Sequence, residues 1–523
     1  MYSLKEYLSN RLRSYLGKEN IFIDVSRSPI KGFDYSTNLL HVVKGLNENE
    51  LVQYLREDEI IDNVEIINRF VNIRLNRKIV FRKILDNFAS DEWRGYDLGK
   101  GKKVLIEFVS ANPTGPLNAV NGRSATFGSV LSNVLKYFNY QVYKEYYVND
   151  VGEQVEKLVD SFIERLKQVR GQEYQIPEGG YHGEYLKDLA EKFLNSSNYT
   201  QEREKIKQFL ISYFVEEHKN TLYNFGVVFD NWFKQSSLTS LESTLKYLSE
   251  KGFLYEDDGA IYFTSTAFGD DKDRVVKKTR GRVDYTYFAY DIEYIKNKFE
   301  RGFDQIITIL GPDHHGYVNR LMAATKALGY SDHKIIILQI VNILEKDRAL
   351  RMSKRKGVMV LLDELINKVK PEFLRYFFIS RLKDSPLDLD LELINRMTLD
   401  NPLYYIFYVY ARINGIIRNY SKTLPALASE VDSDIDDEEF GLFLSAQEFR
   451  DSVLSAINDP YYLTLWAHNF AKSFHRFYNS NKVICADELG IEKEKLRMII
   501  ILFSKGVLER WAELLNIELP EKM

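Results

Sequence analysis

The chain has 523 residues, 45% of them hydrophobic and 28% charged, with a single cysteine, Cys485. This composition excludes a disordered chain and a disulfide-rich one, and the length predicts about three or four domains. A net charge of −4 excludes a strongly basic protein, so nucleic acid would have to be bound by local basic surfaces. The sequence has no signal-peptide core and no apolar stretch of ~18 residues, so we expect a cytoplasmic protein without a membrane segment.

Residues 1–95 combine charged amphipathic stretches with one alternating segment. Leu51, Leu55 and Ile60 recur near helical spacing, and FVNIRLN at 70–76 alternates as a strand does. We therefore expect a small N-terminal α/β domain over 1–95.

The sequence pattern changes at about residue 101. A short apolar run ends in Ala-Asn-Pro-Thr-Gly-Pro at 111–116, which predicts a loop because it holds two prolines and a glycine. Apolar residues at three- and four-residue intervals then predict a helix, and QVYKEYYV at 141–148 predicts a strand. The expected order is strand, loop, helix and strand.

The same order recurs later in the chain. Residues 304–310 predict a strand, 317–328 a helix and 334–341 a second strand. Two such units predict an α/β fold with a Rossmann-type, doubly wound parallel sheet over 96–370. In sheets of this kind ligands bind beyond the carboxyl ends of the strands.

Helical patterns dominate two further regions. Residues 152–251 are expected to form a helical insertion in the α/β domain, and 371–523 an all-helical C-terminal domain. The run SEVDSDIDDEEF at 429–440 carries seven carboxylates and predicts a solvated loop.

The loop RMSKRKG at 351–357 clusters basic residues after a predicted strand. Lys and Arg on such a loop suit a triphosphate, because charge develops on the leaving pyrophosphate. The five-residue pattern alone is also typical of a solvated basic loop. Its place after a strand favours the phosphate site.

The loop at 111–123 lies where the other half of an ATP site is expected. Asn118 and Asn121 are three residues apart at a predicted helix start, so both amides can share one face and meet a phosphate. Asn is also a preferred capping residue. Spacing alone leaves phosphate binding and helix capping open.

An ordered series of motifs resembles class I aminoacyl-tRNA synthetases, specifically the bacterial arginyl type, along nearly the full length. The segments are DYSTNLL (34–40), VLIEFVSANPTGPL (104–117), EYYVNDVGEQ (145–154), DDGAIYF (257–263), FGDDKDRVVKK (268–278), TYFAYDIEYIKNKFERGFD (286–304), GPDHHGY (311–317), RMSKRKG (351–357), NPLYYIFYVYARI (401–413) and LLNIELPEKM (514–523).

The resemblance implies an arginine pocket of five residues: Glu107, Asn112, Tyr287, Asp291 and Asp313. Their types fit the ligand, because a guanidinium is always charged and presents five donors in a planar fork. Glu107 and Asp291 would pair that charge, with Tyr287 as a wall, while Asn112 and Asp313 hold the α-amino end. A lone Glu in an apolar strand is more often simply exposed, but Glu107 directly precedes a ligand loop.

The resemblance also implies an ATP site. Its residues are Asn118, Asn121, Gly122, His314, His315, Arg351, Met352, Ser353 and Lys354, of which Asn118, Asn121 and Lys354 are the expected catalytic residues. Adjacent imidazoles on one loop rarely converge on one ion, and no third ligand is evident, so we expect no protein-bound metal.

The first ATP motif departs from the family pattern. The family carries His-x-Gly-His where this chain has Asn118, Ala119, Val120 and Asn121. An Asn amide still donates a hydrogen bond, but the branched Val120 side chain occupies space near the nucleotide. The expected function is ligation of L-arginine to its tRNA through an arginyl-adenylate, with release of AMP and pyrophosphate. The alternatives are a catalytically silent paralogue that binds tRNA or arginine, and another nucleotidyltransferase on the same fold.

The resemblance implies L-arginine, ATP and the tRNA for arginine as partners. Mg²⁺ would arrive with ATP as a substrate complex. The helical domain would read the anticodon region, and residues 1–95 would touch the tRNA body. The aromatic residues of 404–410 could stack on RNA bases, although helix core is the preferred interpretation. We expect a monomer.

Overall fold

The computed structural model describes residues 3–89, 97–196, 199–280, 284–345, 348–350 and 360–523. It divides into two compact units, one made of Met1–Gly95 with Met397–Met523 and the other of Tyr96–Arg396. The first unit therefore combines segments from both ends of the chain.

The N-terminal part of the first unit is a small α/β structure, in line with the sequence pattern. Its antiparallel sheet has the order β1-β2-β4-β3. The strands are β1 (Val25–Arg27), β2 (Tyr35–Thr37), β3 (Ile61–Ile67) and β4 (Phe70–Leu75), and the helices are α1 (Leu4–Leu16), α2 (Leu39–Val42), α3 (Glu48–Arg56) and α4 (Arg77–Ala89). Leu4, Leu8 and Leu12 are fully buried because their four-residue spacing places them on one face of α1.

The rest of the first unit is helical, as the sequence predicts. Its helices are α15 (Pro402–Asn419), α16 (Asp437–Gln447), α17 (Phe449–Ala456), α18 (Tyr461–Ser480), α19 (Ala486–Leu489) and α20 (Ile491–Leu515). In the aromatic series of α15, Phe407 and Tyr410 are buried and the neighbouring tyrosines are half-buried. Helix core is thus the role of two of these rings.

The prediction of a solvated loop is wrong for the end of the acidic run. Asp436 caps α16 in a reciprocal capping box with Glu439, so the helix begins inside the run. Glu439 is fully buried and its two oxygens accept from Lys493 Nζ at 2.6 Å and Arg497 Nε at 2.7 Å. These two cations remove the like-charge repulsion that otherwise keeps such a run in water.

A five-stranded parallel sheet forms the centre of the second unit and confirms the doubly wound fold. Its order is β13-β12-β5-β6-β7. The strands are β5 (Lys103–Glu107), β6 (Gln141–Val148), β7 (Asn231–Lys234), β12 (Gln305–Leu310) and β13 (His333–Ile337). The chain proceeds from β5 toward β6 on one side and returns as β12 on the other. The switch point, where open α/β sheets bind ligands, therefore lies between β5 and β12.

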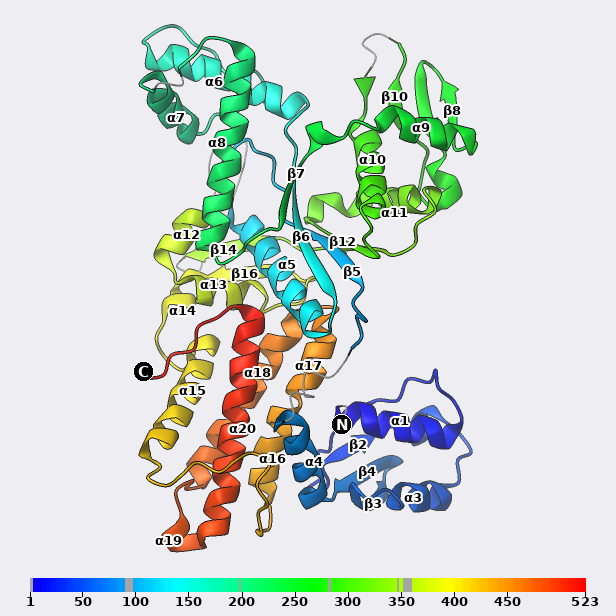
Figure 1. Cartoon of the computed structure of the whole chain (residues 1–523), viewed down its shortest axis with the longest axis vertical. Coiled ribbons are helices and arrows are strands. Elements are labelled where there is room, and N and C mark those ends of the chain that lie inside the picture. The colour runs from blue at the N-terminus through cyan, green and yellow to red at the C-terminus, as the bar shows by residue number, and fades with distance from the viewer. Residues whose placement is uncertain (1–2, 90–96, 197–198, 281–283, 346–347, 351–359) are drawn as a thin grey trace. The chain divides into compact units, whose positions relative to one another are not determined.

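Helices and small sheets lie between these strands along the chain and are labelled in Figure 1. The helix α5 (Ala119–Tyr137) follows β5, and η4 (Pro312–Tyr317) and α11 (Val318–Ala327) follow β12. Between β6 and β7 lie α6 (Glu153–Val169), α7 (Glu184–Leu194) and α8 (Arg203–Asn224), which share an apolar core of their own.

A four-stranded antiparallel sheet separates β7 from β12 along the chain. It consists of β8 (Leu254–Asp257), β9 (Ala260–Phe263), β10 (Arg274–Lys278) and β11 (Asp284–Tyr285), accompanied by α9 (Leu241–Glu250) and α10 (Tyr287–Glu300). The helices α9, α10 and α11 enclose one apolar cluster with this sheet.

The last segment of the second unit contains a third sheet of order β15-β14-β16. Its elements are β14 (Val341–Glu345), β15 (Arg348–Leu350), α12 (Leu362–Lys368), α13 (Pro371–Phe378), β16 (Leu387–Asp390) and α14 (Leu391–Asn395). Because β16 pairs in parallel with β14, residues 371–396 belong structurally with the second unit and not with the helices that follow. Across the described ranges, none of the helices has both the length and the apolar character that a bilayer crossing requires.

Candidate active site at the sheet switch point

Glu107 ends β5 directly at the switch point. Its register partner on β12 is Thr308, so the ends of the two strands lie side by side. The carboxylate is buried, and it accepts from Lys298 Nζ at 2.5 Å and from Ser110 Oγ at 3.1 Å. Lys298, on α10, is only 2% exposed. Each of these two buried groups thus has a partner of opposite charge.

The backbone immediately after Glu107 is strained. Val109 has φ +67° and Ser110 has φ +39°, in the left-handed region that side chains with a Cβ rarely adopt. Hydrogen bonds hold both residues, from Val109 N to Ser124 Oγ at 3.0 Å and from Tyr147 N to Ser110 Oγ at 3.1 Å. Such strain costs about 1–3 kcal/mol per residue and concentrates at functional sites.

Asp291 brings a second carboxylate to Glu107. It lies half-buried in α10, and within the described chain no hydrogen bond reaches its side chain. Burial first and the Glu107 carboxylate second raise the pKa of Asp291 to about 7, against the lowering effect of Lys298 and Arg320. Lys298 bonds to Glu107, whereas no cation bonds to Asp291 within the described chain. A guanidinium is the kind of cation that pairs with such a carboxylate.

Tyr287 lies one helical turn before Asp291 on α10, and Asn112 lies in the loop that follows β5. Tyr287 begins α10 and is 45% exposed, and a Cβ on Gly152 would lie 2.8 Å from its hydroxyl. Asn112 Nδ2 donates to Gln154 Oε1 at 2.6 Å, so the loop side chain is held by the start of α6.

Asn118 and Asn121 cap α5, which is the structural alternative that spacing had left open. Asn118 Oδ1 accepts from Val120 N at 2.9 Å and from Asn121 N at 3.3 Å, and Asn121 Oδ1 accepts from Asn118 N at 3.0 Å. Capping engages the amide oxygens, whereas a phosphate requires the amide nitrogens. The two roles therefore use different atoms of the same side chains.

The end of the loop that precedes α5 contacts residues 360–362, which follow the RMSKRKG segment in the chain. Asn118 forms a β-bridge with Leu361, Ala119 N donates to Val360 O at 3.2 Å, and Leu362 N donates to Leu117 O at 2.9 Å. Gly122 has no room for a side chain, because a Cβ there would lie 2.8 Å from Phe378. The predicted ATP residues Arg351, Met352, Ser353 and Lys354 lie outside the described residues.

Asp313, His314 and His315 lie in η4, which follows the carboxyl end of β12. All three are exposed. His315 Nε2 lies 3.2 Å from Gln339 Nε2, and the His314 ring packs edge-on against Tyr317 with centroids 5.6 Å apart. These three residues make no ion pair within the described structure.

Lys298 is a site residue that the sequence analysis missed. The signal was present, since Asp291, Tyr294 and Lys298 are spaced i, i+3 and i+7 and so share one face of a helix. The Lys298–Glu107 pair itself joins residues 191 positions apart, which no local pattern reveals.

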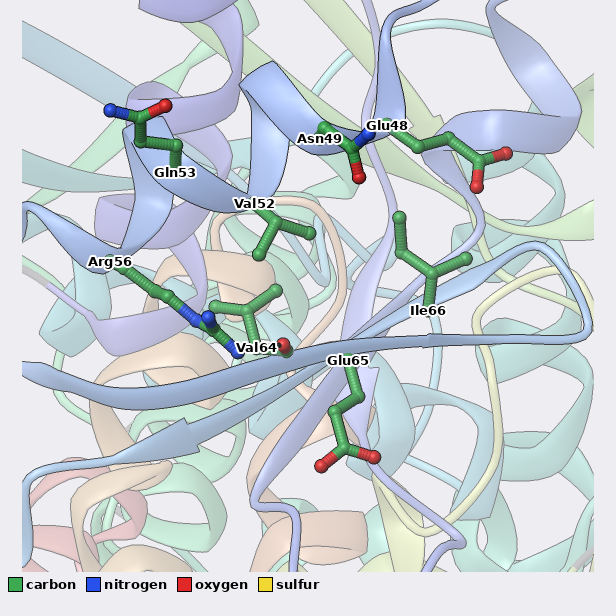
Figure 2. Close-up of a pocket in the computed structure, with 8 residues that line it drawn as sticks. All are labelled: Glu48, Asn49, Val52, Gln53, Arg56, Val64, Glu65 and Ile66. Atoms are coloured by element: carbon green, nitrogen blue, oxygen red, sulfur yellow. Dashed lines mark hydrogen bonds between the residues drawn. The ribbon is translucent and has the colours of Figure 1, made fainter.

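A separate pocket of about 460 Å³ lies in the N-terminal part of the first unit (Figure 2). It is lined by Glu48, Asn49, Val52, Gln53 and Arg56 of α3 and by Val64, Glu65 and Ile66 of β3. The Arg56 guanidinium already donates to Asn63 Oδ1 and to Val64 O. None of the predicted site residues lines this pocket. Over the described ranges, no group of three or more His, Cys, Asp or Glu side chains is arranged to hold a metal.

Comparisons with known proteins agree with this geometry. A family model described as "tRNA synthetases class I (R), catalytic domain" matches residues 84–374, and one described as "DALR anticodon binding domain" matches 406–523. The arginine–tRNA ligase of Desulforamulus reducens is 36% identical over 96% of this chain and 94% of its own length. That of Carboxydothermus hydrogenoformans is 37% identical over 90% of this chain and 88% of its own.

A solved structure shares the fold. The arginyl-tRNA synthetase of Thermus thermophilus superposes with a TM-score of 0.76 over 99% of this chain and 100% of that chain, at 17% sequence identity. At that identity the likeness concerns the fold.

Proposed function

This chain belongs to the class I tRNA synthetases of the arginine type, and on that premise we propose that its switch-point loops bind arginine beside ATP. Its activity is the ligation of L-arginine to tRNA by way of an arginyl-adenylate. The arginine carboxylate attacks the α-phosphate of ATP, and the bond to pyrophosphate breaks. The terminal adenosine hydroxyl of the tRNA then attacks the arginyl carbonyl, and AMP leaves.

One observation carries the assignment of the arginine site: the half-buried Asp291 carboxylate has no hydrogen-bonded cation within the described chain and interacts electrostatically with the buried Glu107 carboxylate. Lys298 pairs with Glu107, and burial together with Glu107 raises the pKa of Asp291. The arginine guanidinium is the missing cation, with Tyr287 as a wall. Asn112 and Asp313 hold the α-amino end of the substrate.

For ATP we assign Asn118, Asn121 and Gly122 on one loop. The amide oxygens of both asparagines fix the start of α5, and amide nitrogen is the donor that a phosphate would use. The exposed His314 and His315 extend the site from β12. Arg351, Met352, Ser353 and Lys354 complete it, with Lys354 contacting phosphate.

Adenylate formation needs no covalent intermediate, so catalysis rests on positioning and charge stabilisation. Mg²⁺ enters with ATP as part of the substrate and needs few protein ligands. The partner is the tRNA for arginine, with the helical domain at its anticodon. We place the protein in the cytoplasm, in keeping with the free, buried thiol of Cys485, and we propose a monomer, which light scattering tests.

Arginine-dependent exchange between ATP and pyrophosphate, with and without tRNA, tests the proposal. Lys354→Ala removes one transition-state contact and should lower exchange by ~10²–10³-fold. Lys246→Ala, at an exposed lysine of α9 that pairs with Glu250 on the same helix, is the matched control and should leave exchange unchanged. Absence of exchange in the unaltered protein, with tRNA still bound, would replace this proposal with the silent-paralogue alternative.

A further inference from the structure

The loop at 111–116 depends on the rest of the protein for its hydrogen bonds. Pro113 and Pro116 have no N–H group, and the short bond from Thr114 N to Asn112 O at 2.7 Å leaves other carbonyls to be satisfied. Carbonyl groups of half-buried backbone need hydrogen-bond donors from the protein or from water. This loop connects the strand that ends at Glu107 to the capped start of α5, so whatever holds its carbonyls also fixes the site.

Three side chains supply those partners. The pairs are Tyr146 Oη with Ala111 O at 2.9 Å, Tyr185 Oη with Thr114 O at 2.9 Å, and His218 Nε2 with Gly115 O at 2.8 Å. A Cβ on Gly115 would lie 2.8 Å from Tyr185 Oη, so the loop and the helix are in direct contact. Tyr185 lies on α7 and His218 on α8. Two of the three partners therefore come from the helices inserted between β6 and β7.

The hydrogen-bond partners of His218 determine its tautomer and its protonation state. The Gly115 carbonyl can only accept, so Nε2 must carry a hydrogen. His218 is buried, and burial lowers its pKa to about 4, which leaves the ring neutral at pH 7. Nδ1 is then an acceptor, and it lies 2.9 Å from Tyr146 Oη.

One hydroxyl hydrogen consequently faces two acceptors. Tyr146 can donate to His218 Nδ1 or to Ala111 O, and in the neutral state it cannot fully satisfy both. The bond from His218 to Gly115 has no such competitor. Of the two loop carbonyls served by this pair, Gly115 is thus the one that is held firmly.

We propose that His218 is a positioning residue for the active site: as a neutral imidazole protonated on Nε2, it holds the Gly115 carbonyl and so fixes the loop that carries Asn112 and leads to Asn118. The inference rests on the proposed roles of those two asparagines in binding arginine and ATP. It gives the helical insertion a direct part in setting the geometry of adenylate formation.

Three substitutions separate positioning from packing. His218→Gln places an amide N–H near the former Nε2 and keeps a donor for Gly115, whereas the shorter His218→Asn reaches only toward Tyr146. Tyr146→Phe keeps the ring stacked on Trp232, with centroids 4.2 Å apart, and removes only the hydroxyl. His333→Asn is the matched control, because His333 is also a buried neutral histidine but bonds to Thr308 and Thr325.

The readouts are Tm and the exchange kinetics of each full-length variant. We expect His218→Asn to lower kcat/KM for ATP in exchange by ~10–100-fold, because a displacement of about 1 Å in a positioned group can cost ~10²-fold. His218→Gln should stay within about threefold of the unaltered protein at a similar Tm loss. His333→Asn should lower Tm while changing kcat/KM by less than about threefold. Tyr146→Phe should fall between the two His218 variants.

Equal kcat/KM values for ATP in His218→Asn and His218→Gln overturn the proposal. This holds if both variants are fully active, and it holds if both lose activity in proportion to their loss of Tm. If the unaltered protein shows no exchange between ATP and pyrophosphate, that result refutes the proposed function and not this inference. The histidine ring ¹⁵N shifts then still decide the inference, with the His218 signals assigned by their loss in His218→Asn. A neutral ring protonated on Nε2 at pH 7 supports it, and protonation on Nδ1, or on both nitrogens, overturns it.

Discussion

Changing Asp291 to Asn should make the catalytic unit more stable while it destroys arginine activation. The ionised Asp291 carboxylate destabilises the folded protein when no arginine is bound, since burial and the neighbouring Glu107 raise its pKa from 3.8 to about 7. Asn has nearly the same shape and no charge, so the substitution removes the cost and also removes the partner of the guanidinium.

The size of the stabilisation follows from the shift. About three pKa units at ~1.4 kcal/mol each give an upper limit near 4 kcal/mol. Because the pKa is raised on folding, the carboxyl favours the folded state fully only below the unfolded value of 3.8, and this stability is lost as pH rises to about 7. The gain from Asp291→Asn should therefore be complete at pH 8 and fall to about a third at pH 5.

Thermal unfolding of the full chain measures the effect. With an unfolding entropy of ~2.1 cal/mol/K per residue over roughly 300 residues, 4 kcal/mol corresponds to about 6 °C in the transition of the catalytic unit. We expect a rise of ~2–6 °C at pH 8 together with a loss of arginine-dependent exchange of at least ~10²-fold.

Glu293→Gln is the control on the same helix. Glu293 is buried, its pKa is raised by burial, and it bonds to Thr244 away from the proposed pocket. This variant should also gain stability at pH 8 but retain exchange. A lower Tm for Asp291→Asn at pH 8, or a gain that does not shrink at pH 5, would refute the electrostatic argument.

Four further outcomes follow from the same structure. KM for arginine should rise by up to tenfold per unit as pH falls below about 7, because a protonated Asp291 cannot pair the guanidinium; steady-state exchange from pH 6 to 8 checks this. Lys298→Met leaves the buried Glu107 without its partner and should destabilise the unit by ~3–5 kcal/mol in denaturant unfolding. Val109→Gly should be about 1 kcal/mol more stable than Val109→Ala, since only glycine tolerates φ +67° without cost. Glu439→Gln should lower the Tm of the helical part of the first unit, because the buried Arg497 and the half-buried Lys493 both lose the charge of the acceptor that they share.

Three of these outcomes have a contrary result that bears directly on the site. A flat arginine KM across pH 6–8 would remove Asp291 from the pocket. Equal stability of the two Val109 variants would mean that the backbone there is unstrained, and a Lys298→Met protein as stable as the original would show that the pair contributes no net stability.

The sequence predicted most of the fold but only part of the site. The central sheet was predictable because apolar runs and helical spacing recur in the same order around 101–148 and 304–341, and periodicity is a local property. The end of the acidic run was predictable in principle, since Asp436 and Glu439 have the spacing of a capping box. Like charge alone led to the loop prediction instead.

Long-range contacts explain what was missed at the site. The His218 bond to Gly115 spans 103 positions, and the Lys298 bond to Glu107 spans 191. Local spacing shows only that Lys298 shares a helix face with Asp291 and Tyr294, and nothing comparable marks His218. The partner of a buried cation or imidazole is identified only by what folding places beside it. Asn118 illustrates the reverse case, where a local pattern indicated both a cap and a phosphate ligand and the structure shows the cap.

The composition of the first unit from both chain ends has a consequence for synthesis on the ribosome. The apolar face of α4 packs on helices near the other end, with Phe81 against Phe443 at 4.6 Å between ring centroids and Phe88 against Phe503 at 4.9 Å. At ~5–20 residues per second, more than 300 residues must emerge between these partners, a delay of roughly 20–80 s. During that interval α4 exposes phenylalanines that only later translation can cover, so nascent chains of this protein have a built-in window in which chaperones can bind α4.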